Sequence, residues 1–301
     1  MLFLGTGASE LIPNPLCGCD VCRRALASRD PRDKRCRSAF LLDGENMIDC
    51  GPDVMSACAK EGVSLQGLKR IFLTHSHSDH FASVTLENLQ MCVTEPPKLE
   101  IYLSREAWEG YQRLGEVLIQ QNYTNYPSEA ARWPKQCTFI PVEPFTKFRA
   151  GDMTVAAVVG RHPGMFDGEQ SLNYLFQKEG KSLFYACDTG LFYPETFDYL
   201  KGFRLNTLVI ECVFGKLPLQ RDKQHMNLEF LFETIDQLTA QGTVNADTHI
   251  YITHVGHKGG LLHEELNEAL QARYGSRICA AYDGLRILRR STLHQRDPVK
   301  T

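Results

Sequence analysis

The sequence predicts a layered α/β domain, in which helices cover β-sheets, and two observations support this class. Apolar runs of four to seven residues alternate along the chain with turns and helical stretches. The 301 residues are 43% hydrophobic and 23% charged, which is the balance of a globular protein with a large buried core. Length alone would also allow two domains, but we expect one domain over residues 1–290 and a polar, frayed tail over 291–301.

The expected elements follow from these runs in chain order. The first residues enter a strand directly and reach a turn at Gly5. Later strands are expected at 38–42, 47–49, 70–74, 99–103, 153–158, 183–187 and 249–253, and the first two of these flank a hairpin turn at 43–46. Helices are expected after residue 80, at 105–120 and at 228–238. The polar and aromatic segment 121–127 is a plain connection, a lid over a site or a contact in a homodimer.

Composition excludes several classes of partner. The net charge is −3, from 33 basic and 36 acidic residues, so the surface offers no broad attraction for nucleic acid. No apolar run approaches the ~20 residues that cross a bilayer, so no membrane partner is expected. The 11 cysteines are an odd number and no basic leader precedes them, so we expect a cytoplasmic protein in a reducing compartment.

The densest chemical feature is the segment 75–80, His-Ser-His-Ser-Asp-His, which places four metal-binding side chains within six residues. It follows the apolar strand 70–74, where the chain turns. His75 and His77 are two residues apart and can reach one ion, whereas the adjacent Asp79 and His80 point elsewhere, towards a second ion. The alternative is a polar surface loop with chance histidines. Two metal ions are the interpretation that this density favours.

Three further candidate ligands lie at strand ends. His162 follows the run 153–158, Asp188 closes the run 183–187, and His254 closes the run 249–253. A carboxylate at the end of a core strand would be costly to bury without a partner, and a cation is the natural partner. Each residue taken singly is more often a hydrogen-bonded structural group, but their common placement indicates one site.

Together these motifs resemble the metallo-β-lactamase superfamily of binuclear hydrolases, over residues 5–290. The resemblance implies a four-layer αββα sandwich with the metals at one edge of its two sheets. It also implies that one ion is bound by His75, His77 and His162, that the other is bound by Asp79, His80 and His254, and that Asp188 bridges them.

A second cluster consists of Cys17, Cys19 and Cys22, three thiols within the six-residue loop 17–22. Three clustered thiolates suit a tetrahedral structural zinc that lacks one ligand. His257, three residues after His254, is the candidate fourth ligand, and it would tie the N-terminal loop to the rim of the active site. The alternatives are buried small apolar side chains or a disulfide.

The thiol loop and the pair His254-Val255-Gly256-His257 narrow the resemblance to one branch. Together with the opening 4–7 and the segment 48–53, they are similar to the phosphodiesterase of the carbon-phosphorus lyase pathway, which hydrolyses a cyclic ribose phosphate. The resemblance implies a small phosphodiester as substrate. Imidazole and carboxylate ligands suit Zn, Mn and Fe alike, so the identity of the two catalytic ions stays open between them.

The expected mechanism uses a hydroxide that the two ions share, which attacks phosphorus while the leaving alkoxide takes a proton. His225 precedes the expected helix 228–238 and is not assigned to either ion. A histidine in this interval is the general acid of related phosphodiesterases, so the resemblance makes His225 a catalytic candidate beside the ligand Asp79. The alternative is a surface histidine at the entry of the helix, where Asn227 is the better N-cap.

Other functions stay open at this point. A hydrolase of the same fold could cleave a thioester, lactone or β-lactam, reactions that depend less on His225. Processing of the transfer-RNA 3′ end would require a long basic arm, which the chain lacks, and a non-catalytic role in pyrroloquinoline quinone synthesis would fit a degraded metal motif. The choice of substrate rests with the pocket wall, for which Arg161, Phe166, Tyr123 and Tyr126 are candidates.

Overall fold

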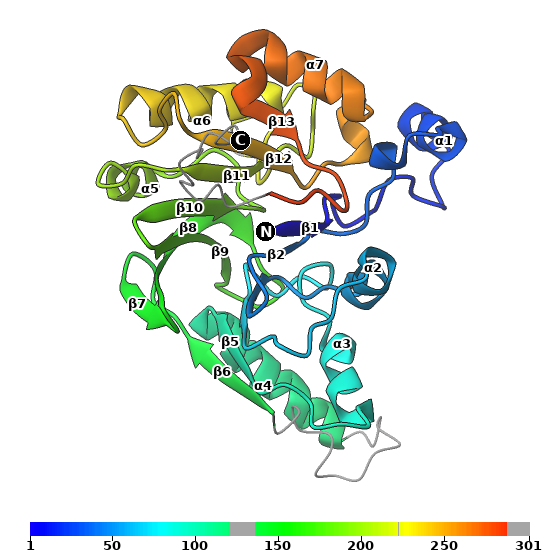
Figure 1. Cartoon of the computed structure of the whole chain (residues 1–301), viewed down its shortest axis with the longest axis vertical. Helices are drawn as coiled ribbons and strands as arrows, with labels where there is room; N and C mark the ends of the chain where they lie inside the picture. Colours follow the sequence, from blue (N-terminus) through cyan, green and yellow to red (C-terminus); the bar gives the residue numbers. More distant parts are fainter. Residues whose placement is uncertain (121–135, 222, 288–301) are drawn as a thin grey trace, which may run out of the picture.

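The computed structural model describes residues 1–120, 136–221 and 223–287, and two facing β-sheets form its centre (Figure 1). The six-stranded sheet contains β1 (Leu2–Gly5), β2 (Ala39–Leu41), β3 (Asn46–Ile48), β4 (Arg70–Phe72), β5 (Leu99–Leu103) and β6 (Cys137–Pro141), in that order. The seven-stranded sheet, ordered from β13 down to β7, contains β7 (Lys147–Ala150), β8 (Met153–Pro163), β9 (Gln170–Lys178), β10 (Lys181–Ala186), β11 (Thr207–Glu211), β12 (His249–Thr253) and β13 (Ile278–Ala280).

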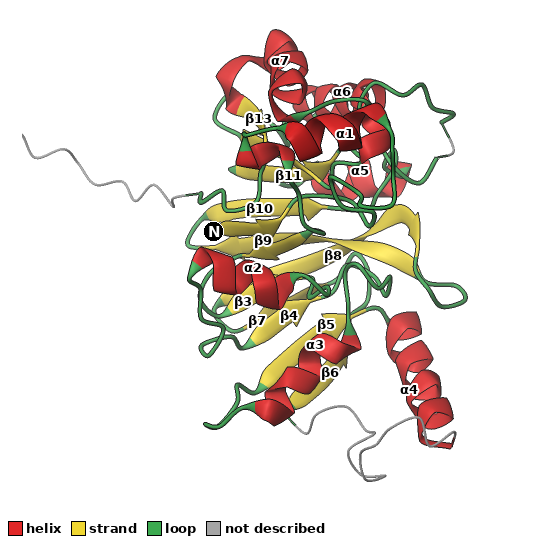
Figure 2. Ribbon diagram, turned by 90° about the vertical axis from the view of Figure 1, so that its right-hand side faces the viewer, coloured by secondary structure: helices red, strands yellow, loops and turns green. Residues whose placement is uncertain are grey.

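Helices cover the outer face of each sheet (Figure 2). The six-stranded sheet carries α2 (Val54–Glu61), α3 (Ser83–Glu87) and α4 (Arg105–Gln120), and the seven-stranded sheet carries α1 (Asp20–Ala27), α5 (Pro194–Leu200), α6 (Leu228–Ala240) and α7 (His263–Tyr274). Short 3₁₀ turns occur at η1 (Pro31–Asp33), η2 (Asn88–Met91), η3 (His257–Gly259) and η4 (Gly275–Arg277). These four layers confirm the predicted αββα sandwich.

The layering follows from the alternation of side chains along each strand. In β4, Phe72 packs between the two sheets, while its neighbour Ile71 packs beneath α2–α4. In β10, Tyr185 packs between the sheets and Phe184 packs beneath α5–α7. Large rings fill the central layer, where Phe72 stacks on Tyr102 with centroids 4.9 Å apart. Each such buried ring contributes about 1.5–3 kcal/mol relative to an exposed one.

Most of the predicted elements occur, with some changed boundaries. The hairpin of β2 and β3 is antiparallel as expected, and the strands 99–103 and 249–253 and the helix 105–120 match in full. The side chain of Asn227 accepts a hydrogen bond from the Phe230 N–H and caps α6. The prediction that a strand ends before His162 was wrong, because β8 stays paired with β9 as far as Pro163, after a shift in register.

Two predictions fall outside the described residues, namely the loop 121–127 and the tail 291–301. Within the described ranges, no helix has both the length and the apolar character that are needed to cross a membrane.

Candidate metal centre

The topology brings the ends of several strands to one edge of the seven-stranded sheet. β10, β11 and β12 are parallel neighbours, and they lead into Asp188, Glu211 and His254 at their carboxyl ends. β8 runs in the same direction as β10, because β9 is antiparallel to both, and so it delivers His162 to the same edge. In the facing sheet, β4 leads into the segment 75–80. The metal-binding side chains therefore converge where the two sheets meet.

The side chains that the sequence assigned to the two ions form two overlapping groups, each with its ligand atoms within 4.8 Å of one another, and Asp188, Glu211 and His225 form a third group of the same kind. The first group is His75, His77, His162 and Asp188, and the second is Asp79, His80, Asp188 and His254. The structure thus brings together every residue that the sequence assigned to the two ions, in the same two sets. Asp188 is the member that both groups share.

The carboxylate of Asp188 lies at the middle of the centre. Its Oδ1 atom is 2.5 Å from Nε2 of His254, and its Oδ2 atom is 3.1 Å from Nε2 of His80 and 3.3 Å from Nε2 of His75. Burial alone would raise the pKa of Asp188, but the imidazoles of His254 and His80 hold it well below its usual range. Asp188 is therefore ionised at neutral pH and can face two cations at once.

Four of the histidines are oriented through the ring nitrogen that points away from the centre. The partners of these Nδ1 atoms are Ser38 Oγ for His254 (2.8 Å), Asp49 Oδ2 for His80 (2.7 Å), Thr74 Oγ1 for His75 (3.2 Å) and the Gln224 carbonyl for His162 (3.4 Å). Such partners fix the ring and leave Nε2 for a metal. His77 differs, because it turns Nδ1 inward, 2.9 Å from Nε2 of His75.

Two observations indicate that these residues are suited to bind divalent ions. Nε2 of His80 is buried and has no hydrogen-bond partner among the described residues, although it faces the carboxylates of Asp79 and Asp188. Burial lowers the pKa of His162 to about 4 and that of His75 well below its ordinary value, so both rings are neutral at pH 7. Such neutral imidazoles offer the lone pairs that a divalent ion requires. At His80 and His254 burial would lower the pKa, but the charge of Asp188 raises it well above its ordinary value, and a bound cation would replace those protons.

The backbone is strained at three residues of this centre. Asp49, Asp188 and His254 have φ values of 61°, 51° and 53°, in the left-handed region that side chains rarely adopt. Such strain collects at functional sites, where the surrounding structure holds it in place. The positions of these side chains at the centre therefore require backbone conformations that are unfavourable by themselves.

The three clustered thiols also meet His257. Nδ1 of His257 is 3.3 Å from Sγ of Cys19 and 3.1 Å from Sγ of Cys22, and Cys17 completes the group. Burial would raise the pKa of Cys19, but hydrogen bonds from Cys22 and His257 lower it to about 7. All 11 cysteines are free thiols, so the disulfide alternative does not occur. The segment is partly helical, since Cys19 caps α1 and Cys22 lies inside it.

His225 lies beside the centre and is held by Glu211, a residue that the sequence interpretation missed. Its Nδ1 atom is 3.2 Å from Oε1 of Glu211 and 3.9 Å from Oδ1 of Asp188. Burial would lower the pKa of His225, but the negative charge of Glu211 outweighs burial and raises it. Glu211 could have been found, because it ends an apolar strand in the same way as Asp188 and His254.

The candidates for the pocket wall differ in position. Nε of Arg161 donates to the Leu191 carbonyl (2.9 Å), and its guanidinium lies 4.4 Å above the ring of Tyr193. Phe166 instead packs edge-on against Tyr111, with centroids 4.9 Å apart, so it is part of the layer beneath α4. Tyr123 and Tyr126 lie outside the described residues.

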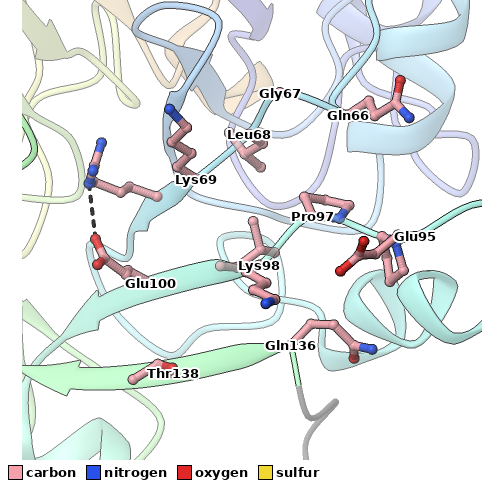
Figure 3. A pocket seen from close by; sticks show the side chains of 13 residues that line it. Gln66, Gly67, Leu68, Lys69, Glu95, Pro97, Lys98, Glu100, Gln136 and Thr138 are labelled. Atoms are coloured by element: carbon pink, nitrogen blue, oxygen red, sulfur yellow. Dashed lines mark hydrogen bonds and ion pairs between the residues drawn. The ribbon is translucent and has the colours of Figure 1, made fainter.

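An open hollow of about 730 Å³ lies away from this chemistry, at the opposite ends of β4 and β5 (Figure 3). Arg70 and Glu100, which line it, pair with each other at 2.9 Å. Lys69, also in its wall, pairs with Glu45 at 2.6 Å. None of the residues in the two metal-binding groups lines this hollow, so it is not part of the centre.

The layers and the shared edge give the chain the metallo-β-lactamase fold, and the ligand geometry there gives it a candidate metal centre. The family model described as Beta-lactamase superfamily domain matches residues 46–250, and the chain belongs to this superfamily. The fold and superfamily predictions are thereby confirmed.

Several known proteins are similar to this chain. A diphosphatase from the PhnP family aligns over 94% of both chains with a TM-score of 0.67 and 23% identity. Zn²⁺-bound PqqB from Methylobacterium extorquens aligns over 94% of this chain and 98% of its own, with a TM-score of 0.65 and 15% identity. An octanoyltransferase of Porphyromonas gingivalis is 28% identical over 289 residues, which are 94% of this chain but 50% of that protein. The chain thus spans about half the length of this curated relative.

Proposed function

We propose that the protein is a phosphodiesterase that hydrolyses a small phosphodiester, cyclic ones included, at a centre for two divalent ions. The observation that carries the proposal is His225, an imidazole with a raised pKa that belongs to neither of the two ligand groups and lies beside the Asp188 that they share. Phosphodiester cleavage releases an alkoxide, which requires such an acid. The likeness in fold to the diphosphatase is consistent with phosphorus chemistry.

The residues that would hold the ions are the two groups already described, with Asp188 common to both. Zn²⁺ or Mn²⁺ bound there would supply a hydroxide from water at neutral pH and neutralise charge on the phosphate. The thiols and His257 would hold a structural zinc, for which their S₃N donor set is suited.

Glu211 and His225 would together protonate the leaving group. Glu211 accepts backbone N–H bonds from Thr189 (2.6 Å) and Met226 (3.2 Å), which fix its carboxylate in place. The same carboxylate is 3.2 Å from Nδ1 of His225, so it stabilises the protonated ring. Nε2 of His225 would then donate its proton to the departing oxygen. Asp188, kept ionised, favours the same protonated state from the other side.

The proposal is tested by the dependence of the rate on the leaving group in His225→Ala. With a cyclic ribose phosphate, whose leaving group is an alkoxide, we expect kcat to fall by about 10²–10⁴-fold at full metal content. With bis(p-nitrophenyl) phosphate the fall should be much smaller, because p-nitrophenolate leaves without a proton. His249→Ala, a change at an exposed histidine on β12, is the matched control. Equal losses for both substrates would contradict the proposal.

A second candidate is the hydrolysis of an acyl thioester, which the likeness to the octanoyltransferase favours. Thiolates leave without a proton, so this reaction would be insensitive to His225→Ala. Comparison of kcat/KM for an octanoyl thioester and for the cyclic phosphate, on the same metal-loaded sample, separates the two. We expect the phosphodiester to be preferred.

A further inference from the structure

Ser76 separates the ligands His75 and His77, and each of its polar groups is bound from outside the segment. Its backbone N–H donates to Oε1 of Glu169 (2.8 Å), and its hydroxyl donates to Oε2 of the same carboxylate. Its carbonyl accepts from the hydroxyl of Tyr111 (3.1 Å). Because Ser76 is only 1% exposed, water does not compete for these bonds. The peptide between the two histidines is therefore fixed by its neighbours.

Glu169 also closes the turn that follows His162. Its Oε2 accepts the N–H of Phe166 (3.3 Å), its own N–H donates to the Phe166 carbonyl (3.1 Å), and its carbonyl accepts the N–H of Gly164 (3.1 Å). The hydroxyl of Ser76 in turn accepts the N–H of Met165 (2.8 Å). One buried carboxylate thus links the segment of His75 and His77 to the turn between β8 and β9.

The turn after His162 lies close against this carboxylate. A Cβ atom on Gly164 would lie 1.9 Å from the carboxylate carbon of Glu169, so the turn passes directly against it. Glu169 is 2% exposed, and its side-chain hydrogen bonds come from Ser76 and from the N–H of Phe166. Amide and hydroxyl donors alone satisfy both of its oxygens.

We infer that Glu169 is a positioning residue, which sets the spacing between His162 and the pair His75 and His77 and so controls binding at that one ion position. The inference rests on the proposed binuclear centre. The three ligands come from two chain segments that Glu169 joins, and Nε2 of His162 lies 3.2 Å from Nδ1 of His77. The other position is anchored separately, since Asp49 orients His80 and Ser38 orients His254.

Glu169→Gln is the sharpest test, because both carboxylate oxygens accept a backbone N–H. The amide must turn its NH₂ group towards the N–H of either Ser76 or Phe166, so one of these bonds is lost. Mn²⁺ is titrated into full-length protein after chelation of the centre, and the two binding constants are compared. We expect one site to weaken by about 10–100-fold, the usual effect of losing a partner that orients a ligand, and the other to keep its affinity.

The matched control is Asp283→Asn. Asp283 is a half-buried carboxylate that accepts hydrogen bonds from the hydroxyl of Thr6 (2.7 Å) and from the backbone N–H of Cys36 (2.6 Å). The Asp283→Asn variant should leave both Mn²⁺ binding constants unchanged. His162→Ala by itself should abolish binding at the ion position of His75, His77 and His162. Adding Glu169→Gln to that variant should therefore cause no further loss of Mn²⁺ affinity. Ser76→Ala, which removes the hydroxyl alone, should weaken the same site by less, and it replaces Glu169→Gln if that variant does not fold.

The outcomes separate this inference from the proposed function. If the wild type binds fewer than two Mn²⁺ ions at the centre, the binuclear proposal fails. If the wild type binds two and Glu169→Gln binds both with unchanged affinity, the positioning role is overturned and the binuclear centre stands. A loss at both sites, or an additional loss in the His162→Ala background, also overturns the selective role.

Discussion

Single residues show how this fold accommodates buried charge away from the metal centre. Arg35 is 4% exposed and donates to Oγ1 of Thr6 (2.8 Å), to the Ala281 carbonyl (2.6 Å) and to Nδ1 of His263 (3.1 Å). Because arginine only donates, His263 must offer it a lone pair. Burial and the neighbouring positive charge lower the pKa of His263 to about 4.

This lowered pKa predicts a dependence of stability on pH. The unfolded chain takes up a proton on His263 near its ordinary pKa of 6.5, whereas the folded protein does so only near 4. The contribution is therefore complete above pH 6.5 and is lost as the pH falls towards 4, by up to about 3 kcal/mol in the free energy of unfolding. Urea unfolding of wild type and His263→Gln at pH 7 and pH 5 measures it, because glutamine accepts from Arg35 without titrating. Parallel pH profiles would contradict this account.

Also at the scale of single residues, the sequence can predict those site residues that lie close together along the chain. His75, His77, Asp79 and His80 lie in one short segment, and a local pattern was enough to identify them. Asp49 and Glu211 are carboxylates that directly follow apolar runs, and Glu169 lies in a polar turn beside Asp167. Their roles become visible only when folding brings His80, His225 and Ser76 to them. Partners that orient a ligand are fixed by tertiary contacts, which a lone sequence does not record.

At the scale of elements, two loops beside the centre are locked together at Gly190. Its N–H donates to the Gln224 carbonyl (3.1 Å), which lies 3.4 Å from Nδ1 of His162 as well. A Cβ atom on Gly190 would lie 2.3 Å from the Lys223 carbonyl oxygen. The loop that carries His225 is thus held against the loop that follows Asp188.

Gly190→Ala should therefore displace His225 without removing a ligand. We expect kcat for a substrate with an alkoxide leaving group to fall by about 10²-fold, the usual effect of a misplacement near 1 Å, when the centre is kept saturated with metal. Saturation is needed because Gln224 also orients the ligand His162. Gly202→Ala is the control, since a Cβ atom there meets its nearest atom only at 3.9 Å. Steady-state kinetics with metal analysis checks the result, and an unchanged kcat would show that the loop contact is not needed.

Strand boundaries illustrate a second limit of sequence interpretation. β12 matched its prediction because the apolar run His249–Thr253 is bounded by polar residues and by the ligand itself. β8 extends to Pro163 because its partner β9 continues the pairing at Gln170, a tertiary contact that the alternation of residues 153–158 does not encode.

For the whole molecule, one strand end connects the two clusters of metal-binding residues. β12 delivers His254 to the centre, and His257, three residues later, meets the thiols of Cys19 and Cys22. Backbone bonds from the Val255 N–H to the Thr6 carbonyl (2.9 Å) and from the Ala8 N–H to the Val255 carbonyl (3.1 Å) hold this segment to the residues that follow β1. A zinc bound by the thiols would therefore support the strained backbone of His254.

The metal content of the purified full-length chain, counted by mass spectrometry beside Asp188→Ala, tests the central claim most directly. Asp188 touches both ligand groups, so its loss should empty both positions of the centre and leave the thiol cluster intact. We predict three ions per chain in the wild type, two of them at the centre, and one zinc in Asp188→Ala. Three ions retained in Asp188→Ala, or a single ion in the wild type, would contradict a binuclear centre organised by this carboxylate.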